Sequence, residues 1–278
     1  MRLAKRTENN PVRAEMSGSP AMISLSDVCK SFVAHGDRVT VLENLSLSVA
    51  KGEFLAIVGP SGSGKSTLLN IIAGIEPPSS GTIHYDGKPM RGVSTHVGYL
   101  TQHDSLLPWR TVAENIAVPL EIRHVLRHES QAQVSAIVRT VGLSGFERHH
   151  PRQLSGGMRK RVMLARTLVY DPETILMDEP FGPLDAQLKT VLQGELLRLW
   201  SNSRKTIVFV THDIVEAITL ADRVVVLSSR PGRIKLIEHI SLDRPRDVHG
   251  VRFLPAFEDH YRRLWDSIEV DVRREASR

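Results

Sequence analysis

The feature that most restricts the fold of this chain is a glycine-rich loop between an apolar run and a helical pattern. Residues 54–58 (FLAIV) form an unbroken apolar run, and residues 66–75 have apolar side chains at helical spacing. The intervening residues fit G-x-x-x-x-G-K-[ST] at every fixed position. They are Gly59, Pro60, Ser61, Gly62, Ser63, Gly64, Lys65 and Ser66. This order predicts a strand buried on both faces, followed by a phosphate-binding loop and a helix.

Each residue type in this loop suits a phosphate chain. Glycines let successive backbone N–H groups point inward at phosphate oxygens, and the helix that begins near Ser66 and Thr67 adds its unpaired N–H groups. Lys65 supplies a positive charge for the β and γ phosphates, and the Ser66 hydroxyl is a ligand for Mg²⁺. We therefore expect a nucleoside triphosphate and Mg²⁺ here.

Three further apolar runs, at residues 174–177, 206–210 and 224–227, predict more strands of the same kind. Because helical stretches separate these runs, they favour a parallel sheet covered on both faces, and hence an α/β fold. Residues 23–32 and 39–49 instead alternate between apolar and polar, although Leu42 is out of phase. That alternation indicates a partly solvated antiparallel sheet.

The pattern also divides the chain. Residues 1–21 are polar, and we expect a flexible arm. Residues 22–240 form the α/β domain, within which residues 103–165 have helical spacing and predict an α-helical insert. Residues 241–278 are a charged extension in which apolar residues recur at three and four, so we expect an amphipathic helix that packs on the domain.

Composition limits the class of protein. The 278 residues are 41% hydrophobic and 24% charged, which is ordinary for a globular chain. Apolar runs fall far short of the ~20 residues of a spanning helix, and we expect no secretory signal. The single cysteine, Cys29, excludes an internal disulfide and fits a reducing compartment. A formal charge of +5 permits nucleic acid or an anionic membrane as a partner.

Polar residues follow two of the predicted strands. Asp178 and Glu179 come directly after the run 174–177, so Asp178 can hold Mg²⁺ through water and Glu179 can polarise an attacking water. His212 follows the run 206–210 and would lie near the γ phosphate. Gln102 stands where the helical insert begins. Each alone is compatible with a solvated strand end or a structural side chain; the phosphate loop on the same sheet favours the catalytic interpretation.

A second anion-binding helix end lies at residues 154–158. Ser155 can cap the helix that follows, while Gly156 and Gly157 leave its N-terminus open. The chain thus has two phosphate-seeking helix ends but one phosphate loop. The economical explanation is that the second end serves a nucleotide held by another copy of the chain.

Over residues 23–240 these features together resemble the ATP-binding subunit of ATP-binding-cassette (ABC) transporters. The resemblance implies a P-loop NTPase (RecA-like) parallel-sheet core, an N-terminal antiparallel β subdomain and an inserted α-helical subdomain. It implies ATP and Mg²⁺, with Lys65, Glu179 and His212 as catalytic residues. Phe32 would stack on adenine, and Gln102 would couple Mg²⁺ and the γ phosphate to the insert.

The resemblance also implies partners. A head-to-tail homodimer closed by ATP would place Ser155, Gly156 and Gly157 against the other subunit's nucleotide, with Asp185 at the seam. The family's signature usually ends in Gln, where this chain has Met158. The chain would also bind transmembrane permease subunits, as a peripheral protein at the cytoplasmic face of the inner membrane, and its ATP hydrolysis would drive them. No nucleic acid is expected as a partner.

Four segments look like the nitrate/sulfonate/taurine branch of bacterial importers. These are residues 106–112, 179–182, 229–234 and 244–246. This finer resemblance implies import of a small anionic or organosulfur solute delivered by an extracytoplasmic binding protein, with Trp109 near the permease.

Other functions remain open from the sequence. A non-transport ABC ATPase acting on nucleic acid or ribosomes fits the basic charge, but such proteins usually carry two cassettes or a long coiled-coil insert. The ATPase of another ABC transporter class, such as an exporter, shares every catalytic motif. A phosphate-loop kinase or GTPase leaves residues 154–157 and His212 unexplained.

Overall fold

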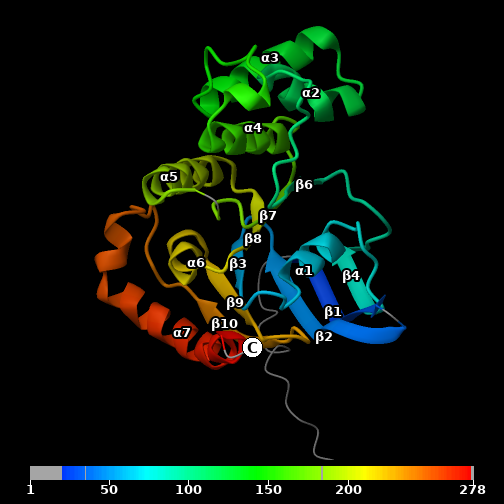
Figure 1. The fold of residues 1–278 in the computed structure, drawn as a ribbon, viewed down its shortest axis with the longest axis vertical. Helices are drawn as coiled ribbons and strands as arrows, with labels where there is room; N and C mark the ends of the chain where they lie inside the picture. The colour runs from blue at the N-terminus through cyan, green and yellow to red at the C-terminus, as the bar shows by residue number, and fades with distance from the viewer. Residues whose placement is uncertain (1–20, 35, 183, 277–278) are drawn as a thin grey trace, which may run out of the picture.

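The computed structural model describes residues 21–34, 36–182 and 184–276. The expected flexible arm lies outside these residues except for Ala21, with which strand β1 begins. Two sheets and a set of covering helices make up the described chain, with a group of helices standing apart at one end (Figure 1).

The central sheet has six strands in the order β10-β9-β3-β8-β7-β6. β10 is antiparallel to β9 and the other neighbours are parallel. The strands are β3 (Phe54–Val58), β6 (Val97–Leu100), β7 (Thr174–Asp178), β8 (Thr206–Val210), β9 (Arg223–Leu227) and β10 (Ile234–His239). The predicted parallel sheet is thus confirmed, and β6 and the antiparallel edge strand β10 are added to it.

Alternation along β3 shows why an unbroken apolar run was needed. Phe54, Ala56 and Val58 belong to the core on one face of the sheet, whereas Leu55 and Ile57 belong to the core on the other. Successive strand side chains point to opposite faces, so a strand covered on both faces has no position at which a polar residue meets water.

The second sheet is antiparallel, in the order β2-β1-β4-β5, and confirms the expected N-terminal β subdomain. Its strands are β1 (Ala21–Ala34), β2 (Asp37–Ala50), β4 (Ser80–Tyr85) and β5 (Lys88–Pro89). Leu42 is fully buried because the β1–β2 register shifts on either side of its partner, Lys30. Such an irregularity turns a side chain to the other face, which explains its phase. Helix α1 (Lys65–Ile72) shares a core with both sheets.

The group of helices that stands apart is the predicted insert. It contains α2 (Val112–Ile122), α3 (Arg127–Thr140), a 3₁₀ turn (Pro151–Gln153) and α4 (Gly156–Leu168). Thr111 begins α2 with a capping box, in which its hydroxyl accepts from the Glu114 N–H and the Glu114 carboxylate accepts from the Thr111 N–H. α4 is the helix of the insert nearest the sheet (Figure 1).

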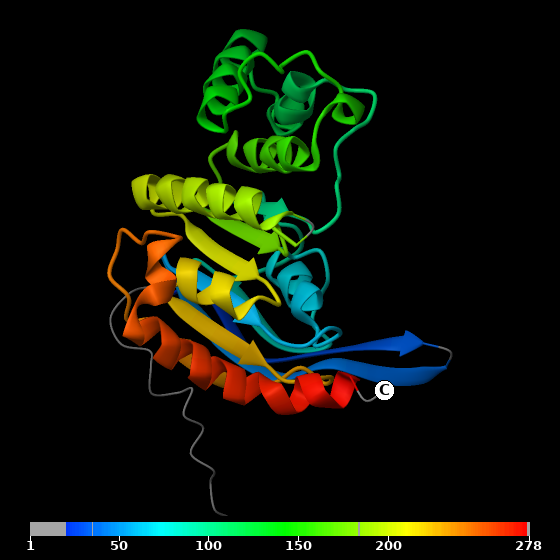
Figure 2. The same ribbon diagram turned by 60° about the vertical axis from the view of Figure 1, so that its left-hand side comes forward.

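The remaining helices cover the face of the central sheet opposite to the face that packs against α1. They are α5 (Ala186–Ser203), α6 (Ile214–Leu220), a 3₁₀ turn (Gly250–Phe253) and α7 (Pro255–Ala276). α7 runs along the β10 side of the sheet towards the β1–β2 hairpin (Figure 2). Phe257, Leu264 and Ile268 are buried against the core, at the spacing of an amphipathic helix.

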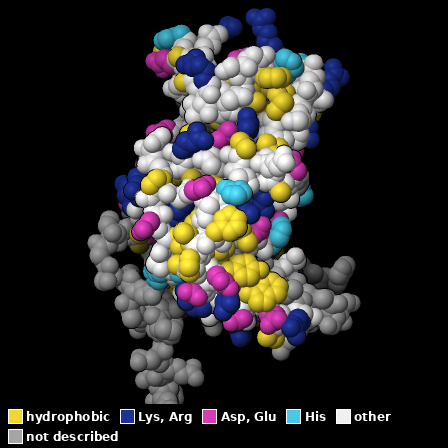
Figure 3. All heavy atoms as spheres, turned by 90° about the vertical axis from the view of Figure 1, so that its left-hand side faces the viewer, with side chains coloured by type: hydrophobic (Ala, Val, Ile, Leu, Met, Phe, Trp, Pro, Cys, Tyr) yellow, Lys and Arg dark blue, Asp and Glu magenta, His cyan; other side chains and the backbone are white. Residues whose placement is uncertain are grey.

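Apolar side chains are exposed in the lower part of the face shown in Figure 3. Exposed large apolar residues of the C-terminal region include Phe253, Leu254 and Trp265. Among the described helices, none combines the length and the apolar character that crossing a bilayer requires.

Candidate nucleotide-binding and hydrolytic site

An open pocket of about 740 Å³ lies where the phosphate loop meets the carboxyl ends of β7 and β8. This volume is typical of a site for a ligand of nucleotide size. Both sheets contribute to the walls, which are formed by Phe32, Val39, Val41, Ser61, Gly62, Gly64, Lys65, Ser66, Thr67, Gln102, Glu179, His212 and Arg230. The structure therefore brings most of the expected site residues together.

The N-terminus of α1 is left open to a ligand. Its N-cap is Gly64, at φ 94°, and no side chain caps it. By contrast, α5 and α6 are capped by the side chains of Asp185 and Asp213. Only glycine adopts such a φ without strain, and an uncapped helix start offers its N–H groups and positive dipole end to an anion.

Lys65 is held under the loop. Its Nζ donates to the carbonyl oxygens of Gly59 and Pro60 at 2.8 and 2.7 Å, and the residue is buried. These bonds fix a positive charge at the start of the loop, on the side that faces the pocket. A phosphate chain bound by the loop N–H groups would lie beside that charge.

Asp178 and Ser66 form an oxygen pair at the pocket edge. Burial raises the pKa of Asp178, and a hydrogen bond from the Ser66 hydroxyl opposes that rise. A hydroxyl beside a carboxylate is a pair of oxygen ligands of the kind that Mg²⁺ accepts. Within the described residues, no cluster of three or more His, Cys, Asp or Glu side chains is placed to hold a metal ion.

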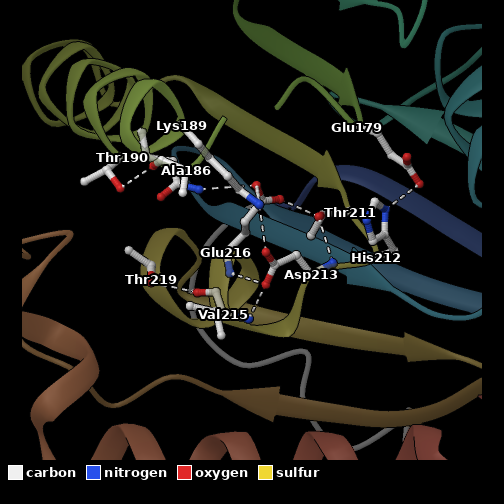
Figure 4. Close-up of polar contacts among 11 residues, drawn as sticks. Glu179, Ala186, Lys189, Thr190, Thr211, His212, Asp213, Val215, Glu216 and Thr219 are labelled. Atoms are coloured by element: carbon white, nitrogen blue, oxygen red, sulfur yellow. Dashed lines mark hydrogen bonds and ion pairs between the residues drawn. The ribbon is translucent and has the colours of Figure 1, made fainter. Parts of the chain in front are cut away.

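The Glu179 carboxylate lies between Gln102 and His212. One oxygen accepts from Gln102 Nε2 at 3.1 Å. The other oxygen is 3.3 Å from His212 Nδ1 (Figure 4). Glu179 itself has φ 45°, an uncommon value for a residue with a side chain. This turn directs the carboxylate out of the end of β7 and towards the pocket.

Phe32, on β1, also lines the pocket, and 40% of the residue's surface is exposed. Val39 and Val41 of β2 line the wall beside it. An exposed ring above an apolar wall is suited to stacking against a flat base. The Lys30 Nζ stands 4.8 Å from the ring centroid and bonds to Glu76 and Pro77.

The second predicted anion-binding helix end, at the start of α4, lies outside this pocket. Ser155 and Gly156 are exposed at the start of α4, and Gly157 packs closely against Leu188 of α5. Asp185 is exposed at the start of α5. These residues do not line the pocket around Lys65. That they act on another subunit's nucleotide stays a prediction.

Sequence reasoning missed a set of polar residues behind His212. The Thr211 hydroxyl donates to Glu216 and accepts from the Asp213 N–H. Lys189 of α5 bridges Asp213 and Glu216 at 2.7 and 2.6 Å (Figure 4). The set fastens the chain on either side of His212 to α5. Asp213 and Glu216 are close together in the sequence, but the cation that pairs with both, Lys189, lies on α5, so no local pattern could have indicated the set.

Two more positions were missed. Lys160 of α4 donates to the backbone carbonyl of Gln102 at 2.8 Å, which ties the helical insert to the loop that approaches Glu179. Arg230, after β9, lines the pocket and donates from Nε to the Gly62 carbonyl at 3.4 Å. From the sequence, the segment 229–234 was identified only as part of a family resemblance, and no role was predicted for Arg230.

Comparison with known proteins agrees with this geometry. The sequence profile described as "ABC transporter" matches residues 42–182. An ABC transporter ATP-binding protein of Methanocaldococcus jannaschii is 48% identical over 84% of this chain and 87% of its own length. An aliphatic sulfonates import ATP-binding protein of Bacillus cereus is 42% identical, covering 83% and 91%. A nitrate import ATP-binding protein of Synechocystis is 42% identical, covering 81% and 84%.

A solved structure shares the fold. The dimeric structure of a bacterial ABC transporter cassette superposes with a TM-score of 0.72 at 32% identity, covering 80% of this chain and all of the cassette. The expected architecture and family are thereby confirmed. This chain belongs to the ABC transporter family, as an ATP-binding subunit whose hydrolysis of ATP is coupled to transport.

Proposed function

We propose that this chain energises an importer of small anionic or organosulfur solutes of the nitrate, sulfonate and taurine type. The observation that carries the ATPase part is that Lys65, Ser66 and Glu179 line one pocket, while Asp178 is hydrogen-bonded to Ser66 at its edge. The direction and the class of solute are supported by two relatives, named for the import of aliphatic sulfonates and of nitrate.

ATP would lie along the pocket with its base against Phe32 and its phosphates under the loop 59–66. Ser66 and Asp178 would hold Mg²⁺, which supplies charge neutralisation between the β and γ phosphates. Lys65, fixed by two loop carbonyls, meets the same phosphates. Thus the chain's own groups position the γ phosphate before any bond is broken.

Glu179 is the general base in this proposal. Its carboxylate accepts a proton from a water that attacks the γ phosphorus, and the bond to the β–γ bridging oxygen breaks to give ADP and phosphate. Gln102 and His212, each hydrogen-bonded or close to one Glu179 oxygen, hold the carboxylate in place. His212 is largely exposed, so it can also reach the γ phosphate.

A second copy would complete each site. The exposed Ser155 and Gly156 present an anion-binding helix start away from their own pocket. In a head-to-tail homodimer they would close over the partner's ATP together with Gly157, and Asp185 would lie at the seam. ATP would then hold the dimer shut, and hydrolysis at Glu179 would release it.

The permease would contact the helical insert. Trp109 stands on this insert with 71% of its surface exposed, as expected of a contact residue awaiting a partner. The Lys160–Gln102 bond provides a direct route from the insert to Glu179. The subunit would therefore be peripheral, at the cytoplasmic face of the membrane, with a solute-binding protein on the opposite side.

Co-purification tests the transporter assignment. Tagged Glu179→Gln protein, loaded with ATP, is used to capture proteins from detergent-solubilised membranes, with Lys65→Ala as the matched variant that fails to hold ATP. A polytopic membrane protein in equal amount would support the proposal. Capture of nucleic acid or ribosomes alone would favour the non-transport alternative.

The solute class needs a separate measurement. A binding protein recovered with the permease can be titrated calorimetrically with taurine, an alkanesulfonate and nitrate. Micromolar binding of one of these would support the import proposal. Binding of none of them, or a permease that moves solute outward in vesicles, would contradict the finer assignment while leaving the ATPase chemistry intact.

A further inference from the structure

One residue of the pocket wall has no part in the chemistry above. Arg230 belongs to the loop between β9 and β10, far in sequence from both the phosphate loop and Glu179. Its guanidinium lies against the tip of the phosphate loop: Nε donates to the Gly62 carbonyl at 3.4 Å, and Nη2 is 3.6 Å from where a Gly62 Cβ would stand.

The loop that carries Arg230 is built to sit on the phosphate loop. A Cβ at Gly232 would lie 2.1 Å from the backbone oxygen of Ser63, so only glycine permits this approach. Gly232 also donates to the Val41 carbonyl at 2.8 Å and accepts from the Glu43 N–H at 3.0 Å. Arg230 is therefore held on a support fixed to both the phosphate loop and β2.

The C-terminal helix braces the same loop from the other side. Asp271 of α7, itself 6% exposed, accepts from the Ser229 hydroxyl at 3.2 Å and from Lys235 Nζ at 2.9 Å. These two partners flank Arg230 in the sequence. The far end of α7 thus reaches the wall of the pocket, in agreement with its course along the sheet (Figure 2).

We propose that Arg230 binds the phosphates of the nucleotide, as a second cation beside Lys65, and that α7 positions it through Asp271. This inference rests on the proposed binding of ATP in this pocket. A guanidinium has five N–H donors in a planar fork, so bonding of Nε to Gly62 leaves the terminal nitrogens for phosphate oxygens. Anchoring on two sides reduces the entropy lost when they bind.

Nucleotide titration tests this. Mg·ATP and Mg·ADP are titrated calorimetrically into the full chain carrying Glu179→Gln, which stops hydrolysis, and then into the same chain with Arg230→Gln added. We expect about tenfold weaker ATP binding, equivalent to about 1.4 kcal/mol. A matching loss for ADP would place the guanidinium on the α or β phosphate, and a loss for ATP alone would place it on the γ phosphate; both support the proposal.

Arg233→Gln is the matched control. Arg233 lies on the same loop, but its guanidinium pairs with Glu43 at 2.7 Å and is 60% exposed. It does not line the pocket. Its replacement should leave ATP affinity within twofold of the parent. Arg230→Lys, which keeps the charge but not the fork, should fall between the parent and Arg230→Gln.

The brace is tested by Asp271→Asn, which keeps the size of the side chain but removes its charge. We expect ATP binding about threefold weaker, with no further loss when Arg230→Gln is already present, because interacting positions are not additive. A purely structural role for Asp271 would lower the melting temperature without nucleotide and weaken binding equally in both backgrounds, and would overturn the brace.

The outcomes separate this inference from the proposed function. If the parent binds no ATP, the proposed function itself fails. If the parent binds ATP and Arg230→Gln binds it equally well, the assignment of Arg230 is wrong. Retained affinity combined with loss of the ATP-dependent dimer, measured by size-exclusion chromatography, would assign Arg230 to the partner subunit and would also overturn the proposal.

Discussion

Replacing Lys189 with methionine should reveal how much the polar set behind His212 stabilises the fold. Lys189 bridges Asp213 and Glu216 at 2.7 and 2.6 Å, and the Glu216 side chain is only 4% exposed. Without its cation, Glu216 would be a buried carboxylate that keeps only the hydrogen bonds from Thr211 and Gln193. Removing one partner of a buried pair costs about 3–5 kcal/mol. Asp213 is 31% exposed and can rehydrate, so we expect the lower end, about 3 kcal/mol.

Urea unfolding measures this loss as a lower midpoint at an unchanged slope. Lys205→Met is the matched control, because Lys205 also makes a 2.7 Å ion pair, but with Asp171, which is 87% exposed. Solvated pairs contribute about 0–1 kcal/mol. Adding Glu216→Gln to Lys189→Met should recover part of the loss by removing the unpaired charge. Equal, small effects of Lys189→Met and Lys205→Met would refute the reasoning.

Three further predictions follow from the same geometry. Burial alone would raise the pKa of Asp213, but the hydrogen bond and charge of Lys189 lower it below 3.8. A carboxyl group whose pKa is lower in the folded than in the unfolded chain stabilises the fold at pH values above its unfolded pKa. That stabilisation is lost as the pH falls through the folded pKa. The difference in free energy of unfolding between the wild type and Lys189→Met should therefore narrow below pH 3.8. A gap that stays constant down to pH 2, measured by urea unfolding, would contradict this. Glu179→Gln should reduce phosphate release by ~10² or more while ATP binding persists; turnover at the parent rate would remove Glu179 as the base. Mixed Lys65→Ala and Ser155→Arg subunits should regain ATPase activity above either variant alone, since one intact composite site would form; absence of recovery would count against the trans arrangement.

The pocket itself was largely predictable, because its residues follow local rules. An apolar run covered on both faces must alternate between two cores, as Phe54 and Leu55 do. The carboxyl ends of parallel strands meet at one edge, so Glu179 and His212 had to be neighbours once β7 and β8 were recognised as parallel. The sequence placed the start of the helix that follows the phosphate loop near Ser66, and the structure begins α1 one residue earlier.

The irregular parts of the fold were less accessible. The short strands β4 and β5 are mostly exposed, so they lack an apolar signature. The inward turn of Leu42 results from register shifts between β1 and β2, which depend on pairing with another strand. A hydrophobic pattern read along one strand cannot show such a shift.

By itself, the sequence determined the class of fold, the place of the phosphate loop and the kind of chemistry, since each depends on residues close together in the chain. Only the tertiary structure decided which distant groups meet. Lys189 reaches Glu216 from another helix, Lys160 grips the backbone of Gln102, and Arg230 rests on Gly62 from 168 residues away. Such contacts are set by how helices pack on the sheet, and no local periodicity specifies which side chains that packing brings within a hydrogen bond of each other.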